Sequence, residues 1–285
     1  MRRKLAWGVL AACSIAAGGC GAGQTAGPAA DSVARAADVT ARVPGYRIEA
    51  TMDVSTGTAT VHGTMSGTMN TGRRAGVITT HETVAGHSLA LTEMLSGTAV
   101  YMRAADLPGV TQITGGKPWL KIDLAHAASA MGLSGLQTGS SDPAQFVDYL
   151  RAVGARQTRV GSQTVGGVPT THYRVTIDLD RYARLVPASD RSSARTGVAT
   201  LESILGSHTL PMDVWIDAHR LVRRMSFTLS ECVADHHLRT TMTMNLVDFG
   251  PQPIPRTPAA SQTYDLTPLL ASQMKKVPLG CGTAA

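Results

Sequence analysis

Residues 46–69 read YRIEATMDVSTGTATVHGTMSGTM, and apolar or small side chains alternate with polar ones along most of this stretch. The apolar or small positions are Ile48, Ala50, Met52, Val54, Ala59, Val61, Gly63, Met65, Gly67 and Met69. Successive side chains of a strand point to opposite faces of its sheet, so this alternation predicts strands with one apolar face and one face in water. One-sided burial of this kind is typical of antiparallel sheets.

Similar alternation continues along the rest of the chain. It predicts further strands at 75–84, 87–95, 98–103, 118–124, 156–165, 168–177, 210–217, 221–230 and 238–249. Gly166-Gly167 between two of them is a two-residue hairpin signal. Short helices are expected at 142–153, 178–186, around 198–205 and from Thr267 onward. About ten or eleven strands and a few helices predict a mainly β (α+β) fold, in which one curved antiparallel half-barrel sheet wraps over short helices.

Composition excludes several classes of protein. The chain has 285 residues, of which 43% are hydrophobic and 16% charged, which is too apolar for a disordered chain. The net charge is +6, but Arg2, Arg3 and Lys4 supply three of these charges. The remaining 23 basic and 20 acidic residues give no basis for a nucleic-acid partner.

The N-terminus has the form of a secretory signal over residues 1–19: MRRK, then fifteen apolar or small residues, then Cys20. The segment Ala17-Gly18-Gly19-Cys20 is similar to a bacterial lipobox, which predicts an acylated Cys20 and a flexible tether over 20–35. Cys13, after Leu10-Ala11-Ala12, is a rival acylation site, and an ordinary cleaved signal is a third interpretation. The lipid anchor would place the protein at the extracytoplasmic face of the cell membrane.

Two further cysteines, Cys232 and Cys281, lie in the expected folded body. An exported protein meets an oxidising compartment, so we expect a disulfide between them that holds the C-terminus to the sheet. The alternative is two separate thiols.

Three stretches in a fixed order support a resemblance to a known family. They are GKPWLKID at 116–123, LPMDVWID at 210–217 with LVRR at 221–224, and VDFG at 247–250 ahead of a proline-rich tail. Behind a lipobox, this order resembles the LppX/LprG family of actinobacterial cell-envelope lipoproteins, and more distantly the LolA/LolB carriers. The resemblance implies a single LolA-like domain over 36–285, with a cavity for lipid acyl chains between sheet and helices. Its members are linked to carrying lipids or lipoglycans across the periplasm.

The methionines of the expected strands fit such a cavity, because Met is unbranched and adapts to irregular apolar ligands. The candidate lining residues are Ile48, Met52, Met65, Met69, Leu89, Met102, Val214, Met225, Met242 and Met244. The expected function is to bind lipid acyl chains, without a cofactor or a metal. The alternative is a non-catalytic structural or regulatory envelope module with a filled core, in which Met fills gaps and a protein is the partner.

Signals for catalysis are weak, and we do not expect an enzyme. Gly86-His87-Ser88-Leu89-Ala90 is close to a nucleophile elbow, but the sequence continues as a strand where that motif needs a helix. Ser272 and Lys275 match S-x-x-K without its companion motifs. His236-His237 is expected in a surface turn. Arg220 with Arg223-Arg224 is a basic site for anionic lipid head groups, or a solvated hairpin face.

Overall fold

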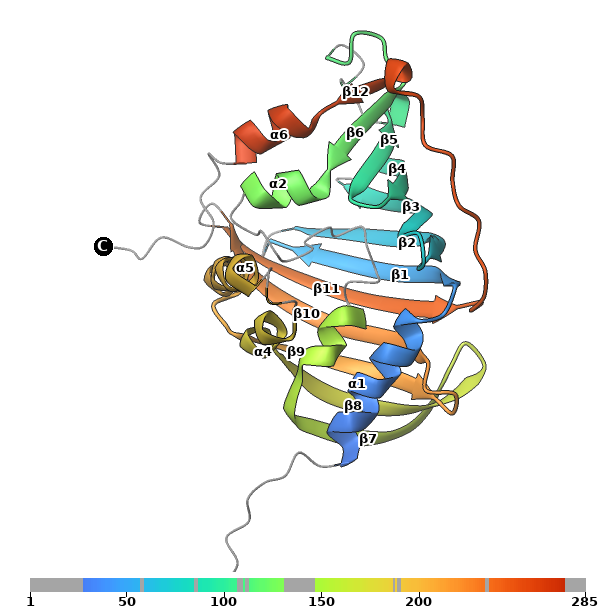
Figure 1. The fold of residues 1–285 in the computed structure, drawn as a ribbon, viewed down its shortest axis with the longest axis vertical. Helices are drawn as coiled ribbons and strands as arrows, with labels where there is room; N and C mark the ends of the chain where they lie inside the picture. Colours follow the sequence, from blue (N-terminus) through green and yellow to red (C-terminus); the bar gives the residue numbers. More distant parts are fainter. Residues whose placement is uncertain are drawn as a thin grey trace, which may run out of the picture.

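The computed structural model describes residues 28–56, 59–84, 87–106, 110, 113–130, 147–186, 188, 191–233 and 236–274. Twelve strands form a single curved, unclosed sheet in the order β12-β6-β5-β4-β3-β2-β1-β11-β10-β9-β8-β7 (Figure 1). All neighbouring strands pair antiparallel except β12 and β6, which are parallel. The mainly β fold class predicted from the alternation is confirmed.

The sheet consists of two meanders joined at its centre. The first meander comprises β1 (Gly45–Ser55), β2 (Thr60–Asn70), β3 (Ala75–Val84), β4 (His87–Ser96), β5 (Ala99–Arg103) and β6 (Trp119–Asp123). The second comprises β7 (Val153–Val165), β8 (Val168–Asp178), β9 (Thr209–Asp217), β10 (Val222–Val233) and β11 (His236–Val247). The central seam is the pairing of β1 with β11, from Arg47 opposite Val247 to Ser55 opposite Arg239.

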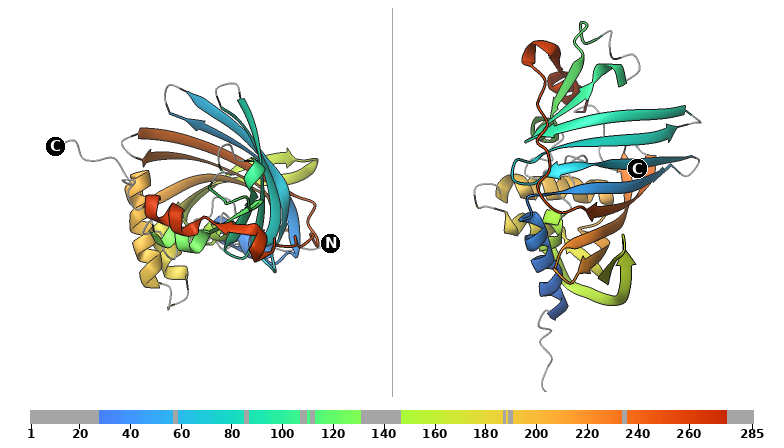
Figure 2. Two further views of the ribbon diagram at one scale, coloured as in Figure 1. Left: turned by 90° about the horizontal axis from the view of Figure 1, so that it is seen from above. Right: turned by 90° about the vertical axis from the view of Figure 1, so that its right-hand side faces the viewer.

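Helices cover the concave face of the sheet (Figure 2). They are α1 (Pro28–Ala41), α2 (Leu124–Ala130), α4 (Leu179–Leu185), α5 (Arg191–Leu205) and α6 (Thr267–Met274), with 3-10 turns η1 (Ala104–Asp106), η3 (Leu150–Ala152) and η5 (Ala260–Gln262). Helix α1 packs on β7, β9 and β10, while α4 packs on α5 and α2 on α6. Within the part of the chain described, none of these helices is long and apolar enough to cross a bilayer.

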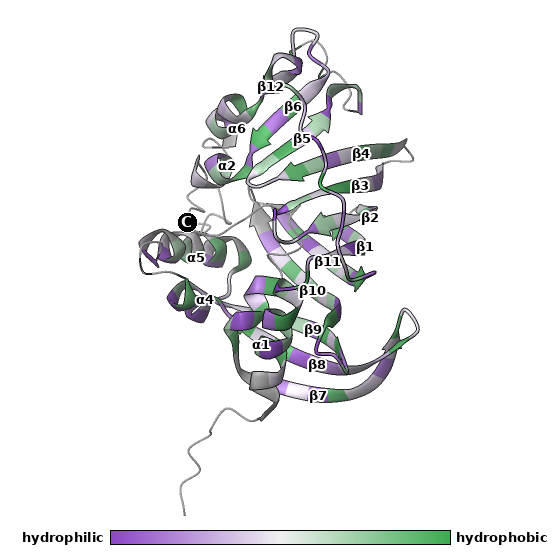
Figure 3. Ribbon diagram, turned by 45° about the vertical axis from the view of Figure 1, so that its right-hand side comes forward, coloured by the Kyte–Doolittle hydropathy of each residue, from purple (hydrophilic) through white to green (hydrophobic). Residues whose placement is uncertain are grey.

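Hydrophobic and hydrophilic residues alternate along the strands (Figure 3), and the buried apolar residues of strands and helices form one core. On β9, Leu210, Met212 and Val214 are buried on the helix-covered face, whereas Pro211 on the other face is exposed. The Gly166-Gly167 turn joins β7 to β8 with φ angles of 56° and 80°, a left-handed conformation that glycine adopts without steric cost. The β7–β8 hairpin is therefore set by its local sequence.

Two segments differ from the sequence-based expectation near the helices. Residues 28–35, expected within the flexible tether, belong to α1. Val33, Ala36, Ala37 and Thr40 lie at helical spacing and are fully buried, so contact with the sheet holds these small residues in a helix. Of the helix expected at 142–153, residues 142–146 lie outside the described part of the chain and 147–152 are helical, ending in the 3-10 turn η3. Val153, expected in this helix, begins strand β7 instead.

The proline-rich segment after β11 is a strap along the ends of the strands, from residue 248 to η5 (Figure 1). The Gly250 amide donates to the Gly45 carbonyl at 2.9 Å, and the Asn70 side-chain amide donates to the Gln252 carbonyl at 3.1 Å. The strap ends in β12 (Thr263–Asp265), which pairs with β6. This short strand is the one that the sequence-based count of strands missed.

Candidate functional site

The register of the first meander aligns two rows of side chains across the concave face. One row runs through Met52, Gly63, Glu82 and Leu89, and the next contains Met65, Thr80 and Leu91. A cavity of about 160 Å³ opens on these rows. Its lining consists of Met52, Met65, Thr80, Glu82, Leu89, Leu91, Glu93 and Met242.

The volume of this methionine cavity limits what it holds in this conformation. A cavity of about 150 Å³ accommodates one benzene-sized apolar group, whereas ligand sites usually measure about 300–1,000 Å³. The methionine cavity therefore has room for a short stretch of an acyl chain and not for a whole lipid. Methionine side chains have three rotatable bonds, so they are well suited to move aside and enlarge the cavity for a longer acyl chain.

The ten candidate lining residues separate into two groups. Met52, Met65, Leu89 and Met242 line the methionine cavity. The other six are buried in the core: Ile48, Met69, Met102, Val214, Met225 and Met244. The sequence interpretation missed Leu91, Thr80, Glu82 and Glu93. The alternation could have identified them, because Thr80 and Glu82 are two residues apart on 75–84 and so point to the same face of the strand. The same holds for Leu91 and Glu93 on 87–95.

A third carboxyl group on the concave face, that of Glu231, lies on β10 at the alternation of Phe227 and Leu229. Burial raises the pKa of Glu231 because it penalises the charged form. The folded state then holds the proton more tightly than the unfolded chain does. The charged Glu231 therefore lowers the free energy of unfolding at a pH above its pKa in the folded state. This loss is recovered as the pH falls through that pKa toward the lower pKa of the unfolded chain.

Replacement of Glu231 by glutamine is therefore expected to stabilise the protein at pH 7. The gain over the wild type should shrink as the pH is lowered through the raised pKa, because the wild-type carboxyl becomes neutral there. Urea denaturation of both proteins between pH 4 and 8 measures this difference. A constant difference across that range would show that the charge of Glu231 is not the cause.

Ser88 does not lie in the geometry of a nucleophile elbow. It is in β4, paired with Thr83 of β3, and the chain continues as a strand to Ser96 where an elbow would turn into a helix. Gly86 and Lys275 fall outside the described residues, and Ser272 lies in α6. Among the residues that the structure covers, no group of three or more His, Cys, Asp or Glu side chains is placed to hold a metal ion.

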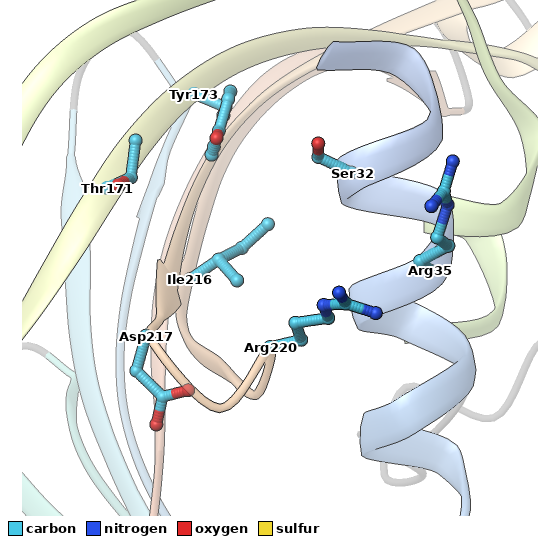
Figure 4. A pocket seen from close by; sticks show the side chains of 7 residues that line it. All are labelled: Ser32, Arg35, Thr171, Tyr173, Ile216, Asp217 and Arg220. Atoms are coloured by element: carbon cyan, nitrogen blue, oxygen red, sulfur yellow. The ribbon is translucent and has the colours of Figure 1, made fainter. Parts of the chain in front are cut away.

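The arginines after the β9–β10 turn are engaged by neighbouring side chains. Arg223 Nε lies 2.6 Å from Asp217 Oδ2, and the guanidinium stacks over Phe249 at 4.6 Å. Arg224 Nε donates to Asn245 Oδ1 at 2.7 Å. These two arginines therefore brace the sheet, whereas Arg220 lines a cavity that is separate from the methionine cavity (Figure 4).

The acylation of Cys20 and the disulfide between Cys232 and Cys281 stay predictions. The signal peptide over 1–19, Cys13, Cys20 and Cys281 lie outside the described residues. Cys232 lies in β10 with its backbone opposite His237 of β11.

The fold is an open, curved antiparallel sheet over helices, and several known proteins are similar to this chain. No family model matches the chain. A 31.2 kDa Streptomyces griseus protein from the rplA–rplJ intergenic region, described as uncharacterized, is 30% identical over 163 residues. The match covers 55% of this chain, which spans about half (51%) of the relative's length.

Two solved structures are lipoproteins of the family that the sequence resembles. LprF from Mycobacterium bovis is 15% identical with a TM-score of 0.43, covering 81% of this chain and 97% of its own. Lipoprotein LppX from Mycobacterium tuberculosis is 13% identical with a TM-score of 0.44, covering 80% and 98%. A putative outer membrane lipoprotein-sorting protein domain from Vibrio parahaemolyticus, at 12% identity and a TM-score of 0.28, covers 80% and 93%.

Proposed function

We propose that this protein is an extracytoplasmic lipoprotein, anchored to the cell membrane through acylated Cys20, that binds lipid acyl chains between its sheet and its helices. It would carry or chaperone envelope lipids. The observation that supports this function is the methionine cavity on the concave face, lined by Met52, Met65, Leu89, Leu91 and Met242. An acyl chain needs an apolar channel with adaptable walls, and flexible thioether side chains supply one.

The second candidate function is a non-catalytic envelope module that binds a protein. The observation in its favour is the small volume of the methionine cavity, about 160 Å³, beside a well-filled core. Under this function the methionines fill the interior and no lipid enters.

Filling the methionine cavity distinguishes the two functions. A Cβ built on Gly63 lies 3.4 Å from Glu82 Cγ and 3.7 Å from Met52 Cε, so the position accepts a side chain that points among the lining residues. For Gly63→Leu we expect at least a tenfold loss in uptake of a fluorescent fatty acid, with the fold retained. Probe titration of the anchored protein in nonionic detergent measures uptake.

Thr64→Leu is the matched control, because Thr64 is the next residue on β2 and is exposed on the opposite face. It adds the same side chain outside the methionine cavity and should leave uptake unchanged. Native mass spectrometry of protein taken from its own membrane gives the complementary result. Retained lipid supports the carrier, whereas lipid-free protein that also refuses the probe supports the protein-binding module.

A further inference from the structure

A cavity of about 490 Å³ lies on the face of the sheet opposite the helices, where β5 ends and β6 begins. Its lining includes Thr92, Arg103, Gly116, Lys117, Pro118 and Trp119. Arg103 follows Met102, which is buried on the concave face, so the Arg103 side chain points to the other face. Trp119 lies opposite Arg103 across the β5–β6 ladder and shares that face. We refer to this cavity as the Trp119 groove.

The backbone around the Trp119 groove is held by the connection between β5 and β6. The chain returns toward β6 through Gly115 and Gly116, whose φ angles of 62° and 80° are left-handed and suit glycine. The Ala104 amide donates to the Pro118 carbonyl at 2.9 Å, which joins the end of β5 to the start of β6. The lining side chains therefore project from hydrogen-bonded backbone.

The part of the lining that the structure describes contains two cations and no acidic side chain. Lys117 Nζ donates to the Thr263 carbonyl at 3.0 Å, a neutral acceptor that leaves the positive charge uncompensated. Arg103 is exposed, and its side chain forms no ion pair or hydrogen bond with any described residue, Asp106 included. Residues 107–112, which follow in the chain, carry no charge. The Trp119 groove therefore favours an anionic ligand.

Trp119 gives the groove an aromatic wall. Its side chain is only partly buried, and Ala105 and Pro118 add apolar surface beside it. Its indole N–H donates to none of the described residues, so it is a further donor beside Arg103 and Lys117. A matching ligand combines an apolar ring face with several acceptor oxygens.

We propose that the Trp119 groove binds a segment of an acidic polysaccharide, whose acidic groups lie at Arg103 and Lys117. The C–H face of a sugar ring is apolar and packs on an aromatic ring such as that of Trp119. Guanidinium and ammonium groups form strong, charge-assisted hydrogen bonds with anionic oxygens. The volume of about 490 Å³ compares with about 150 Å³ for one benzene-sized ring, so there is room for more than one sugar unit.

The place of the Trp119 groove disfavours a peptide as the ligand. An extended peptide gains affinity from main-chain hydrogen bonds at a free edge of a sheet. Strand β6 is paired on both sides, with β5 and with β12, so it offers no such edge here. The groove and the methionine cavity also lie on opposite faces of the sheet, so this inference does not rest on lipid binding.

Calorimetric titration of the mature protein in nonionic detergent tests the proposal with three probes. They are trigalacturonate, the neutral sugar maltotriose, and acetyl-triglutamate amide, a peptide with the same charge as trigalacturonate. We expect saturable binding of trigalacturonate and at least tenfold weaker binding of the other two. Arg103→Gln and Trp119→Leu should each weaken trigalacturonate binding at least tenfold. Trp119→Phe keeps an aromatic ring and should lose less than Trp119→Leu.

Arg159→Gln is the matched control for the loss of one exposed positive charge, because Arg159 lies on β7 at the opposite edge of the sheet. It should bind trigalacturonate like the wild type. Equal binding of maltotriose would overturn the need for an acidic group, and equal binding of the peptide would overturn the choice of a sugar.

No binding of trigalacturonate, or equal affinities of Arg103→Gln and Arg159→Gln, would overturn the Trp119 groove as the site. Thermal unfolding shows whether each variant is folded. If Trp119→Leu does not fold, the exposed Arg103 and the conservative Trp119→Phe still decide the outcome. Fatty-acid uptake by the same samples should be unchanged, and it reports separately on the methionine cavity.

Discussion

Gly67→Ala is expected to lower the free energy of unfolding by about 3 kcal/mol, the upper part of the range for overpacking. A Cβ on Gly67 would overlap the Val77 carbonyl oxygen and lie 2.8 Å from Ile78 Cα on the neighbouring strand β3. Backbone atoms in a hydrogen-bonded ladder do not move aside as a flexible side chain does, so β2 and β3 must separate locally. Urea denaturation measures the loss.

Gly63→Ala is the matched control for this prediction. Gly63 lies four residues earlier on the same strand and face, but its Cβ would meet only side-chain atoms at 3.4 Å or more, apart from the His81 carbonyl at 3.7 Å. Its free energy of unfolding should change by less than about 1 kcal/mol. Equal losses at Gly63 and Gly67 would mean that close backbone approach does not explain the effect.

Asp217→Ala is expected to cost about 3–5 kcal/mol, as for other buried ion pairs that lose one partner. The substitution removes the acceptor of Arg223 Nε and of the amides of His219 and Leu221, and it leaves Arg223, whose side chain is 18% exposed, without its partner. The β9–β10 turn loses its side-chain hydrogen bonds and keeps only the backbone bonds of Asp217 with Arg220 and Leu221. Chemical denaturation monitored by circular dichroism gives the value.

Asp53→Ala provides the comparison for an exposed ion pair. Asp53 Oδ1 lies 2.6 Å from His62 Nδ1, and both side chains are at least half exposed. Exposed pairs contribute about 1 kcal/mol or less, so this substitution should change stability little. If Asp217→Ala cost no more than Asp53→Ala, the buried network would not be what stabilises the turn.

Local patterns predicted most of the sheet because each hairpin of a meander depends on neighbouring residues. Alternation at Met52 and Met65 and the Gly166-Gly167 turn are signals of this kind. Helix α1 and strand β12 lack such signals. The small residues of α1 gain a helical structure by packing on β7, β9 and β10, and β12 is three residues that pair with β6 far away in the chain.

The sequence predicted only some of the residues that line the methionine cavity, because a local pattern does not show what packs against each strand. Alternation assigns Met52 and Met225 to the same face, but it does not distinguish a position against a helix from one beside a cavity. Met225 is fully buried in the core, whereas Met52 lines the methionine cavity. The sequence analysis did not predict Glu82 and Glu93 as lining residues because charged residues are expected on the solvent-exposed face of a strand. Their register with β2 and β5 places them on the concave face.

The seam between β1 and β11 has a consequence for biogenesis. A chain that emerges from its N-terminus completes the first meander while the partner of β1, some 190 residues downstream, does not yet exist. During that interval β1 presents a row of unsatisfied amides and carbonyls at an open edge, the arrangement most prone to pairing with other chains. Strand β1 is therefore open to mispairing until β11 arrives, and closing so long a loop makes this step slow.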